Sequence, residues 1–566
     1  MAERFDVENR DWPERPWIMA GVGAVAGLLV HLLTNDAHDP GAPFPVWKQA
    51  ATSFTVIAAL SFLLTVELRR WTWSIAFAAC WGAVIALVGW YTAQYNRVPD
   101  IFEFPFLSGI LAVLIAAPLF QTVRDTGAWR FPYARLHRHA WTDAVIGAAG
   151  LIFTGITFLL SWLIAALFDV IGIEAIRNLL EKEWFAWCLA GLAFGGAVGL
   201  LRERDALLAT LQKLVMVVLA VLAPVMAAAL GAFLLSIPFT GLSGLWESDI
   251  PATPMLLLSG AGAVLLANAV IGDGEEERTS SLLLRRAALV LVICVLPLSV
   301  LAALSMGERI NQYGWTPERI WGVVAVAIAI SYGLAAWWAV YRGRASFDQP
   351  LRPLQTRLAI ALCGLALLLA LPIIDFGAVS ARSQLARLEA GKIKAEEFDW
   401  TAMAFEFGPE GRGRLAAMAR SGPAELRELA RTALASENRY DLRGAAEEIA
   451  QQARVEERVR LLSPDIELTA PLKQELTGFK GCNDRPCALM RLDAGRLLLV
   501  HNPHGVAVQS RVIDLASLGK GLKGPRDAVP GAEPVKVDLA RATIELRPVN
   551  RRQLYVEGKP VGEPVE

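Results

Sequence analysis

Residues Ala287–Ser305 read AALVLVICVLPLSVLAALS, and this stretch contains no charged side chain. An α-helix needs about 20 mostly apolar residues to cross the hydrocarbon core of a bilayer. The stretch meets that requirement. A soluble protein can bury one or two such helices in its core, but it has no room for a long succession of them. The number of such stretches therefore separates a membrane protein from a soluble one.

The same pattern occurs eleven times before residue 377, with short polar segments between the repeats. Charged residues make up 19% of the chain, which is below the share found in ordinary soluble domains. Trp and Tyr stand at many of the segment ends, as they do at the two surfaces of a membrane. We therefore predict an α-helical polytopic membrane protein with about 11 transmembrane helices. The segments are Trp17–Leu33, Ala50–Val66, Trp73–Tyr91, Phe104–Phe120, Ala144–Ile173, Trp184–Leu201, Leu214–Leu235, Pro254–Ile271, Ala287–Ser305, Ile320–Val340 and Leu358–Phe376.

Lys and Arg are unevenly shared between the two sides of this arrangement. Loops on the amino-terminal side hold 19 of them, and loops on the opposite side hold 6. Cytoplasmic loops accumulate Lys and Arg, so the N-terminus is predicted to be cytoplasmic. An odd number of spans then places the C-terminus in the periplasm, with the spans in the bacterial inner membrane. The predicted regions are a cytoplasmic segment (1–16), a transmembrane domain (17–376), a helical extracytoplasmic region (377–462) and a β-rich region (463–566).

The charged tail has the pattern of an α+β domain. The segment from Ser421 through Pro423 is a typical helix start, and Asp441 is expected to cap a second helix that ends near Leu462. After residue 488, short apolar runs alternate with Gly and Pro turns, which favours strands. The predicted strands are Leu489–Leu492, Leu497–His501, Val506–Asp514, Val535–Val549 and Gln553–Glu557.

Two cysteines of the tail are close together in sequence. Cys482 and Cys487 lie on the predicted oxidising side of the membrane, which favours a disulfide between them. His501 and His504 follow and give a loose zinc-ligand pattern, although two residues between the histidines are fewer than in the usual zinc finger. A third alternative is a pair of free thiols. We predict the disulfide and no metal site.

Two loops on the predicted outer side combine aromatic and polar residues, SIPFTGLSGLWE at Ser236–Glu247 and ERINQYGWTPER at Glu308–Arg319. One interpretation is anchoring at the membrane surface plus helix capping. The other is a ligand site for an anionic headgroup, because guanidinium binds phosphate through paired hydrogen bonds. If the two loops meet, the arginines either pair internally, making a lid, or face an open groove. We favour the lid. The candidate ligand-binding residues are Trp246, Glu247, Arg309, Gln312, Tyr313, Trp315 and Arg319.

The segments SIPFTGLSGLWE and RINQYGWTPERIW resemble signature segments of an uncharacterised bacterial family, domain of unknown function four-one-five-three. The resemblance covers about residues 15–376. It implies a multi-pass bacterial membrane protein and transfers no activity, cofactor or site residue.

Several classes of function are excluded or disfavoured by the sequence. The chain contains no GxxxxGK[ST], HExxH or GxSxG motif. Its formal net charge of −1, without a basic stripe outside the loops, gives no case for nucleic acid. We therefore expect no catalytic residues and no cofactor, the lipid bilayer as surroundings, and an envelope protein partner for the tail. The expected function is a non-enzymatic envelope scaffold or sensor, and the alternative is a transporter or lipid-handling protein with a site at the outer membrane face.

Overall fold

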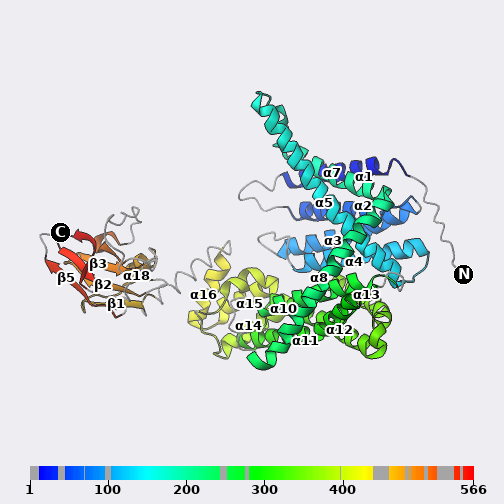
Figure 1. Cartoon of the computed structure of the whole chain (residues 1–566). Helices are drawn as coiled ribbons and strands as arrows, with labels where there is room; N and C mark the ends of the chain where they lie inside the picture. Colours follow the sequence, from blue (N-terminus) through cyan, green and yellow to red (C-terminus); the bar gives the residue numbers. More distant parts are fainter. Residues whose placement is uncertain are drawn as a thin grey trace. The chain divides into compact units, whose positions relative to one another are not determined.

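The structure is a computed structural model of the whole chain (Figure 1). It describes residues 12–35, 45–68, 70–95, 104–241, 251–274, 279–395, 397–436, 455, 458–478, 482, 486–502, 508–518, 541–548, 552–556 and 558–565. Within these residues, 11 helices are long and apolar enough to cross a membrane, which confirms the predicted number. They are α1 (Arg15–Thr34), α2 (Val46–Thr65), α3 (Trp71–Tyr95), α4 (Phe104–Thr126), α5 (Tyr133–Val170), α7 (Glu183–Glu203), α8 (Asp205–Thr240), α10 (Ala252–Ile271), α11 (Leu282–Tyr313), α12 (Pro317–Gly343) and α13 (Asp348–Ala370).

Helices α1 and α7 pack backbone against backbone. A Cβ atom added at Gly191 would lie 1.9 Å from the carbonyl oxygen of Gly23, and one added at Gly23 would lie 2.0 Å from that of Gly191. Gly195 approaches the carbonyl of Met19 in the same way. Small residues four positions apart allow such close contact between membrane helices. The glycine face at Gly191, Gly195 and Gly199 is therefore used inside the chain.

The second half of the bundle is built around α11. Its buried residues, among them Leu291, Val295 and Leu298, belong to one core cluster with residues of α8, α10, α12 and α13. Leu291 is fully buried, so the most apolar stretch of the sequence lies in the centre of this core.

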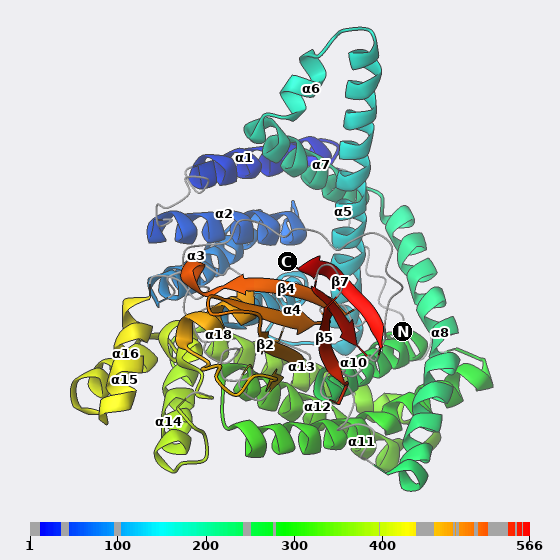
Figure 2. The same cartoon turned by 90° about the vertical axis from the view of Figure 1, so that its left-hand side faces the viewer.

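The helix α5 is longer than a bilayer requires. It has 38 residues, or about 57 Å at 1.5 Å per residue, against a hydrocarbon core of about 30 Å. Its C-terminal half extends beyond α1 and α7, and the short helix α6 (Ala175–Leu180) leads back towards α7 (Figure 2). Arg177 of α6 donates to Asp169 of α5 at 2.8 Å, which ties the two helices together. The side chains of Leu159, Leu163 and Leu167 are exposed in the isolated chain, as expected of a helix that faces lipid.

The chain divides into two compact units, residues 1–392 with 402–414, and residues 393–401 with 415–566. Helix α14 (Phe376–Glu389) and the π-helix Ala402–Glu406 thus group with the transmembrane helices. The second unit contains the end of α15 (Gly408–Ser421), then α16 (Ala424–Ala435), α18 (Ala470–Gly478) and all the strands.

The strands of the second unit form two sheets. The first has the order β1 (Val459–Leu461), β2 (Cys487–Arg491), β3 (Arg496–His501) and β4 (Gln509–Asp514). The second has the order β5 (Ile544–Pro548), β6 (Arg552–Val556) and β7 (Lys559–Val565). One face of the first sheet packs on residues of α18 through Leu497 and Leu499, and the other packs on the second sheet through Leu498 and Val500. Burial on both faces explains why β3 reads as a continuous apolar run.

One prediction for the tail is wrong. The helix expected to run from Asp441 to Leu462 lies largely outside the described residues, but its end is a strand, because Val459–Leu461 pairs parallel with β2. The β-branched Val459 of β1 packs against the core between α18 and the first sheet, so tertiary pairing overrides the local helical pattern. Strand β7 and helix α18 were not predicted.

Candidate functional site

Three arginines converge on the C-terminal end of α2. Arg15 of α1 donates to the carbonyl oxygen of Val66 at 2.9 Å. Arg124 of α4 donates to that of Thr65, and Arg202 of α7 donates to those of Leu63 and Leu64. The last carbonyls of a helix have no partner within it, and cations are stabilising there because of the helix dipole. We call Arg15, Arg124 and Arg202 the α2 arginine cluster.

The charge of this cluster is partly balanced by Glu67. Its carboxylate lies 2.7 Å from Arg15 and 3.2 Å from Arg202. Burial by itself would raise the pKa of Glu67, but the charges of Arg202, Arg15 and Arg124 outweigh it and hold the pKa below its usual value. Gln121 of α4 completes the arrangement, donating to Leu64 at 2.9 Å and to Asp143 of α5 at 2.8 Å.

A second helix end is capped in the same way. Arg352 of α13 donates to the carbonyl oxygen of Ile271, at the end of α10, and to that of Gly274, both at 3.0 Å. Arg138 of α5 reaches Asp273 beside it at 3.3 Å. Helix α5 therefore contributes to both places, through Asp143 at one and Arg138 at the other.

Both caps join helix ends that the predicted topology places on one side. The N-termini of α1, α5 and α13 meet the C-termini of α2, α4, α7 and α10. All of these ends border the loops that hold the larger share of Lys and Arg. The cationic side chains at these two places are held by protein groups, so they stabilise the bundle.

The second of the predicted outer loops forms a turn that is clamped by side chains. Arg387 of α14 donates to the carbonyl oxygens of Asn311 and Gln312. Gln384 of α14 donates to those of Tyr313 and Trp315, each at 3.0 Å. Gly314 has φ +76°, and Arg319 donates to its carbonyl at 2.8 Å and lies over the Tyr313 ring, 5.3 Å from its centroid.

This geometry bears on the lid and groove interpretations of the loop. Arg319 is bound to backbone carbonyls, and Gln312 donates to Glu308 at 3.0 Å. The exposed residues of the loop include Glu308, Arg309, Asn311, Gln312, Tyr313, Trp315 and Glu318. The described partners of Arg319 are carbonyls and not the glutamates that the lid interpretation named, so the lid stays a prediction. Trp246 and Glu247 of the first loop lie outside the described residues, and so does the predicted meeting of the two loops there. The Trp315 N–H also donates to the hydroxyl oxygen of Ser383 at 3.2 Å. Sequence reasoning missed Ser383, Gln384 and Arg387, which follow the last span.

The hydrogen bonds from Gln384 and Arg387 to the turn predict that removing one of these side chains lowers stability without changing lipid binding. Arg387→Ala should lower the free energy of unfolding by about 1–2 kcal/mol, since two carbonyls lose a charged donor at a partly exposed site. Lipid retained in detergent extracts should not change. Arg309→Ala is the matched control, expected to cost less than about 0.5 kcal/mol. Loss of bound lipid at unchanged stability, in Arg319→Ala or Arg309→Ala, would favour the groove and the lipid-handling alternative.

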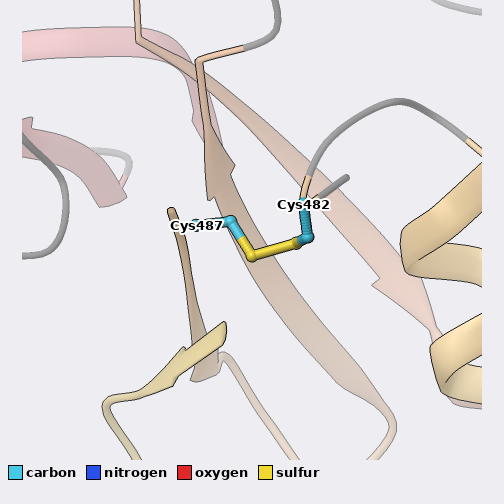
Figure 3. The surroundings of a disulfide bond; sticks show 2 residues. All are labelled: Cys482 and Cys487. Carbon is cyan, nitrogen blue, oxygen red and sulfur yellow. A yellow bond between two sulfur atoms is a disulfide. The ribbon is translucent and has the colours of Figure 1, made fainter. Parts of the chain in front are cut away.

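Cys482 and Cys487 are bonded, which confirms the predicted disulfide (Figure 3). Their Cα atoms are 5.3 Å apart, within the roughly 7 Å that a disulfide can bridge. Both residues are fully buried in the core between α18 and the first sheet. Because each sulfur is bonded to the other, neither is a thiolate available for the zinc alternative in this state. Burial, and next the charge of Arg511, lower the pKa of the nearby His501; His504 lies outside the described residues.

The comparison with protein families agrees with this architecture. A model of a domain of unknown function, DUF4153, matches residues 52–403. The chain belongs to this family. The DUF4153 match begins within α2 and ends within the π-helix Ala402–Glu406, so it includes α14 and the clamped turn, while all the strands lie beyond it. No curated protein and no solved structure matches the chain.

Proposed function

We propose that this DUF4153 protein is a non-enzymatic scaffold or sensor of the bacterial inner membrane, with a periplasmic C-terminal domain that binds an envelope protein. The observation that carries the proposal is the buried disulfide of that domain. Disulfides form and persist in oxidising compartments and are rare in the cytosol. A periplasmic domain is also what the distribution of Lys and Arg predicts.

The transmembrane helices fit the role of an anchor. Their arginines at the ends of α2 and α10 bind protein carbonyls, and those at the outer turn do the same. The strand-containing unit has two core clusters of its own, and its strands lie beyond the family match. This division supports a protein that holds a separate binding domain at the membrane surface.

The topology is tested first. Reporter fusions after residues 205, 280 and 350 should give cytoplasmic signals, and fusions after residues 312 and 480 should give periplasmic signals. Chains trapped in acid from intact cells should take up two more thiol-reactive polymer tags after reduction than before it. The variant Cys482→Ser/Cys487→Ser is the control and should show no such difference. A cytoplasmic signal at residue 480 would refute the proposal.

The partner is tested in the same cells. A photoreactive residue at Arg496 or Arg431, both exposed in the second unit, should give an adduct of defined mass with an envelope protein. The same residue at the exposed Trp129, in a predicted cytoplasmic loop, should not give that adduct. If neither tail position gives one, while the purified protein moves solutes or lipids across vesicles, the transporter alternative replaces the scaffold.

A further inference from the structure

His501 lies on the face of the sheet that holds the disulfide. In the ladder of β2 and β3, Ala488 is opposite Val500 and Leu489 is opposite Leu499. Continuing this register by one residue sets Cys487 opposite His501. Residues directly opposite in an antiparallel pair point to the same face, with Cβ atoms about 4.5–5.5 Å apart. Leu489, Leu499 and Cys487 indeed belong to one core cluster.

The His501 side chain is buried without a full set of partners. Its residue is 7% exposed, and its Nδ1 atom is buried with no hydrogen bond. Buried polar atoms almost always have a partner, so an exception needs an explanation. Imidazole nitrogen and cysteine sulfur are both ligand types that zinc binds, and the register places His501 opposite one of the two cysteines.

We propose that Cys482, Cys487 and His501 form a zinc site that opens when the disulfide is reduced. The inference rests on the proposed function, because it names what the sensor domain would detect, the thiol redox state of the periplasm and zinc. In the oxidised structure, no group of three or more His, Cys, Asp or Glu side chains among the described residues could hold a metal ion. Reduction supplies the two missing ligands.

The chemistry balances with a dithiol as the reductant. The S–S bond of Cys482–Cys487 breaks, the dithiol is oxidised to a disulfide, and its two protons pass to the two cysteine sulfurs. Zn²⁺ then displaces these protons and binds the two thiolates. His501 gives the third ligand through an imidazole nitrogen, and water completes the tetrahedral site. The reverse exchange with a disulfide re-forms the Cys482–Cys487 bond, returns that disulfide to a dithiol with two protons from water, and releases the metal.

The test uses the full-length protein in detergent, with cobalt(II) as the probe. A phosphine serves as the reductant, because it forms a phosphine oxide and does not chelate zinc as a dithiol does. Reduced wild-type protein should take up one cobalt ion more than the Cys482→Ala/Cys487→Ala variant and show thiolate-to-cobalt charge-transfer absorption. Zinc should displace this cobalt. The double variant also corrects for the four cysteines of the spans.

Two single variants identify the third ligand. His501→Ala keeps both thiols and should weaken cobalt binding by at least about tenfold. Asn502→Ala is the matched control, because Asn502 is the next residue on the chain and is also 7% exposed. It should bind cobalt as the wild type does. Hydrogen exchange across β2 and β3 checks that each reduced variant is folded.

Three results would overturn the zinc site. They are equal cobalt binding by the oxidised protein, no thiolate-to-cobalt absorption after reduction of folded protein, and unchanged affinity in His501→Ala. None of them affects the reporter fusions or the adducts at Arg496 and Arg431. Failure of the zinc site is therefore distinguishable from failure of the proposed function.

Discussion

Gly191→Ala is expected to lower the free energy of unfolding by more than about 3 kcal/mol and to remove most of the monodisperse protein from detergent extracts. The added Cβ would lie 1.9 Å from the Gly23 carbonyl oxygen, a distance that no side-chain rotation relieves. Overpacking usually costs about 1–3 kcal/mol. The cost here is larger because backbone faces backbone, and α1 and α7 must separate along their whole contact.

The same helices supply matched controls. A Cβ at Gly196 would meet its nearest neighbour, the Ala20 methyl group, at 3.5 Å, and a Cβ at Gly21 would meet nothing within 4 Å. Gly196→Ala and Gly21→Ala should therefore melt at or above the wild-type temperature, since alanine is the better helix former. Thermal melting and gel-filtration yield decide the matter. If Gly191→Ala melts like Gly196→Ala, the close packing of α1 on α7 is wrong.

Arg202→Met is expected to cost about 3 kcal/mol. The Arg202 side chain is only 7% exposed, and methionine keeps much of its length while removing its charge. The carbonyls of Leu63 and Leu64 lose a charged donor, and Glu67 loses its ion pair with Arg202. Removing one partner of a buried ion pair typically costs about 3–5 kcal/mol. Because Arg15 remains beside Glu67, the loss of stability is expected at the lower end of that range.

The control for this substitution is a surface ion pair. Arg431 is 60% exposed and lies 3.6 Å from Glu428, so Arg431→Met should cost less than about 0.5 kcal/mol. Chemical unfolding of the two variants in the same detergent gives the comparison. Equal losses would mean that the end of α2 is stable without Arg202, and that the α2 arginine cluster is not a structural element.

The transmembrane helices could be predicted because a single property, the length of an apolar stretch, determines whether a segment can span a membrane. Apolar length is legible in a stretch such as Ala287–Ser305 without knowledge of any neighbour. The disulfide was predictable for a similar reason, since Cys482 and Cys487 are close in sequence. The ends of the helices were harder to predict. Helix α5 begins at Tyr133, well before the predicted Ala144. Its first turns are polar because side chains such as Arg138 and Asp143 bind protein groups there.

The α2 arginine cluster could not be read from the sequence. Arg15, Arg124 and Arg202 each look like an ordinary loop arginine that stays on the cytoplasmic side. These arginines bind backbone carbonyl oxygens. Every residue has such an oxygen, so no sequence pattern shows which ones an arginine will bind. The turn at residues 311–315 shows the same limit, since Arg387 donates to the Gln312 carbonyl from 75 residues further along the chain. Polar residues after the last span are the signal that would have suggested α14.

The contact between Arg202 and the end of α2 also determines when, during synthesis of the chain, the C-terminal end of α2 is fully capped. Arg202 is 138 residues beyond Leu64, and a ribosome adds about 5–20 residues per second. Roughly 7–28 s therefore pass between the synthesis of Leu64 and that of Arg202, the last residue to donate to the end of α2. Helices α3, α4 and α5 are synthesised during this interval. During that interval water or lipid headgroups must solvate the waiting carbonyls. Assembly of the first half of the protein is thus finished only when the sixth span has been inserted.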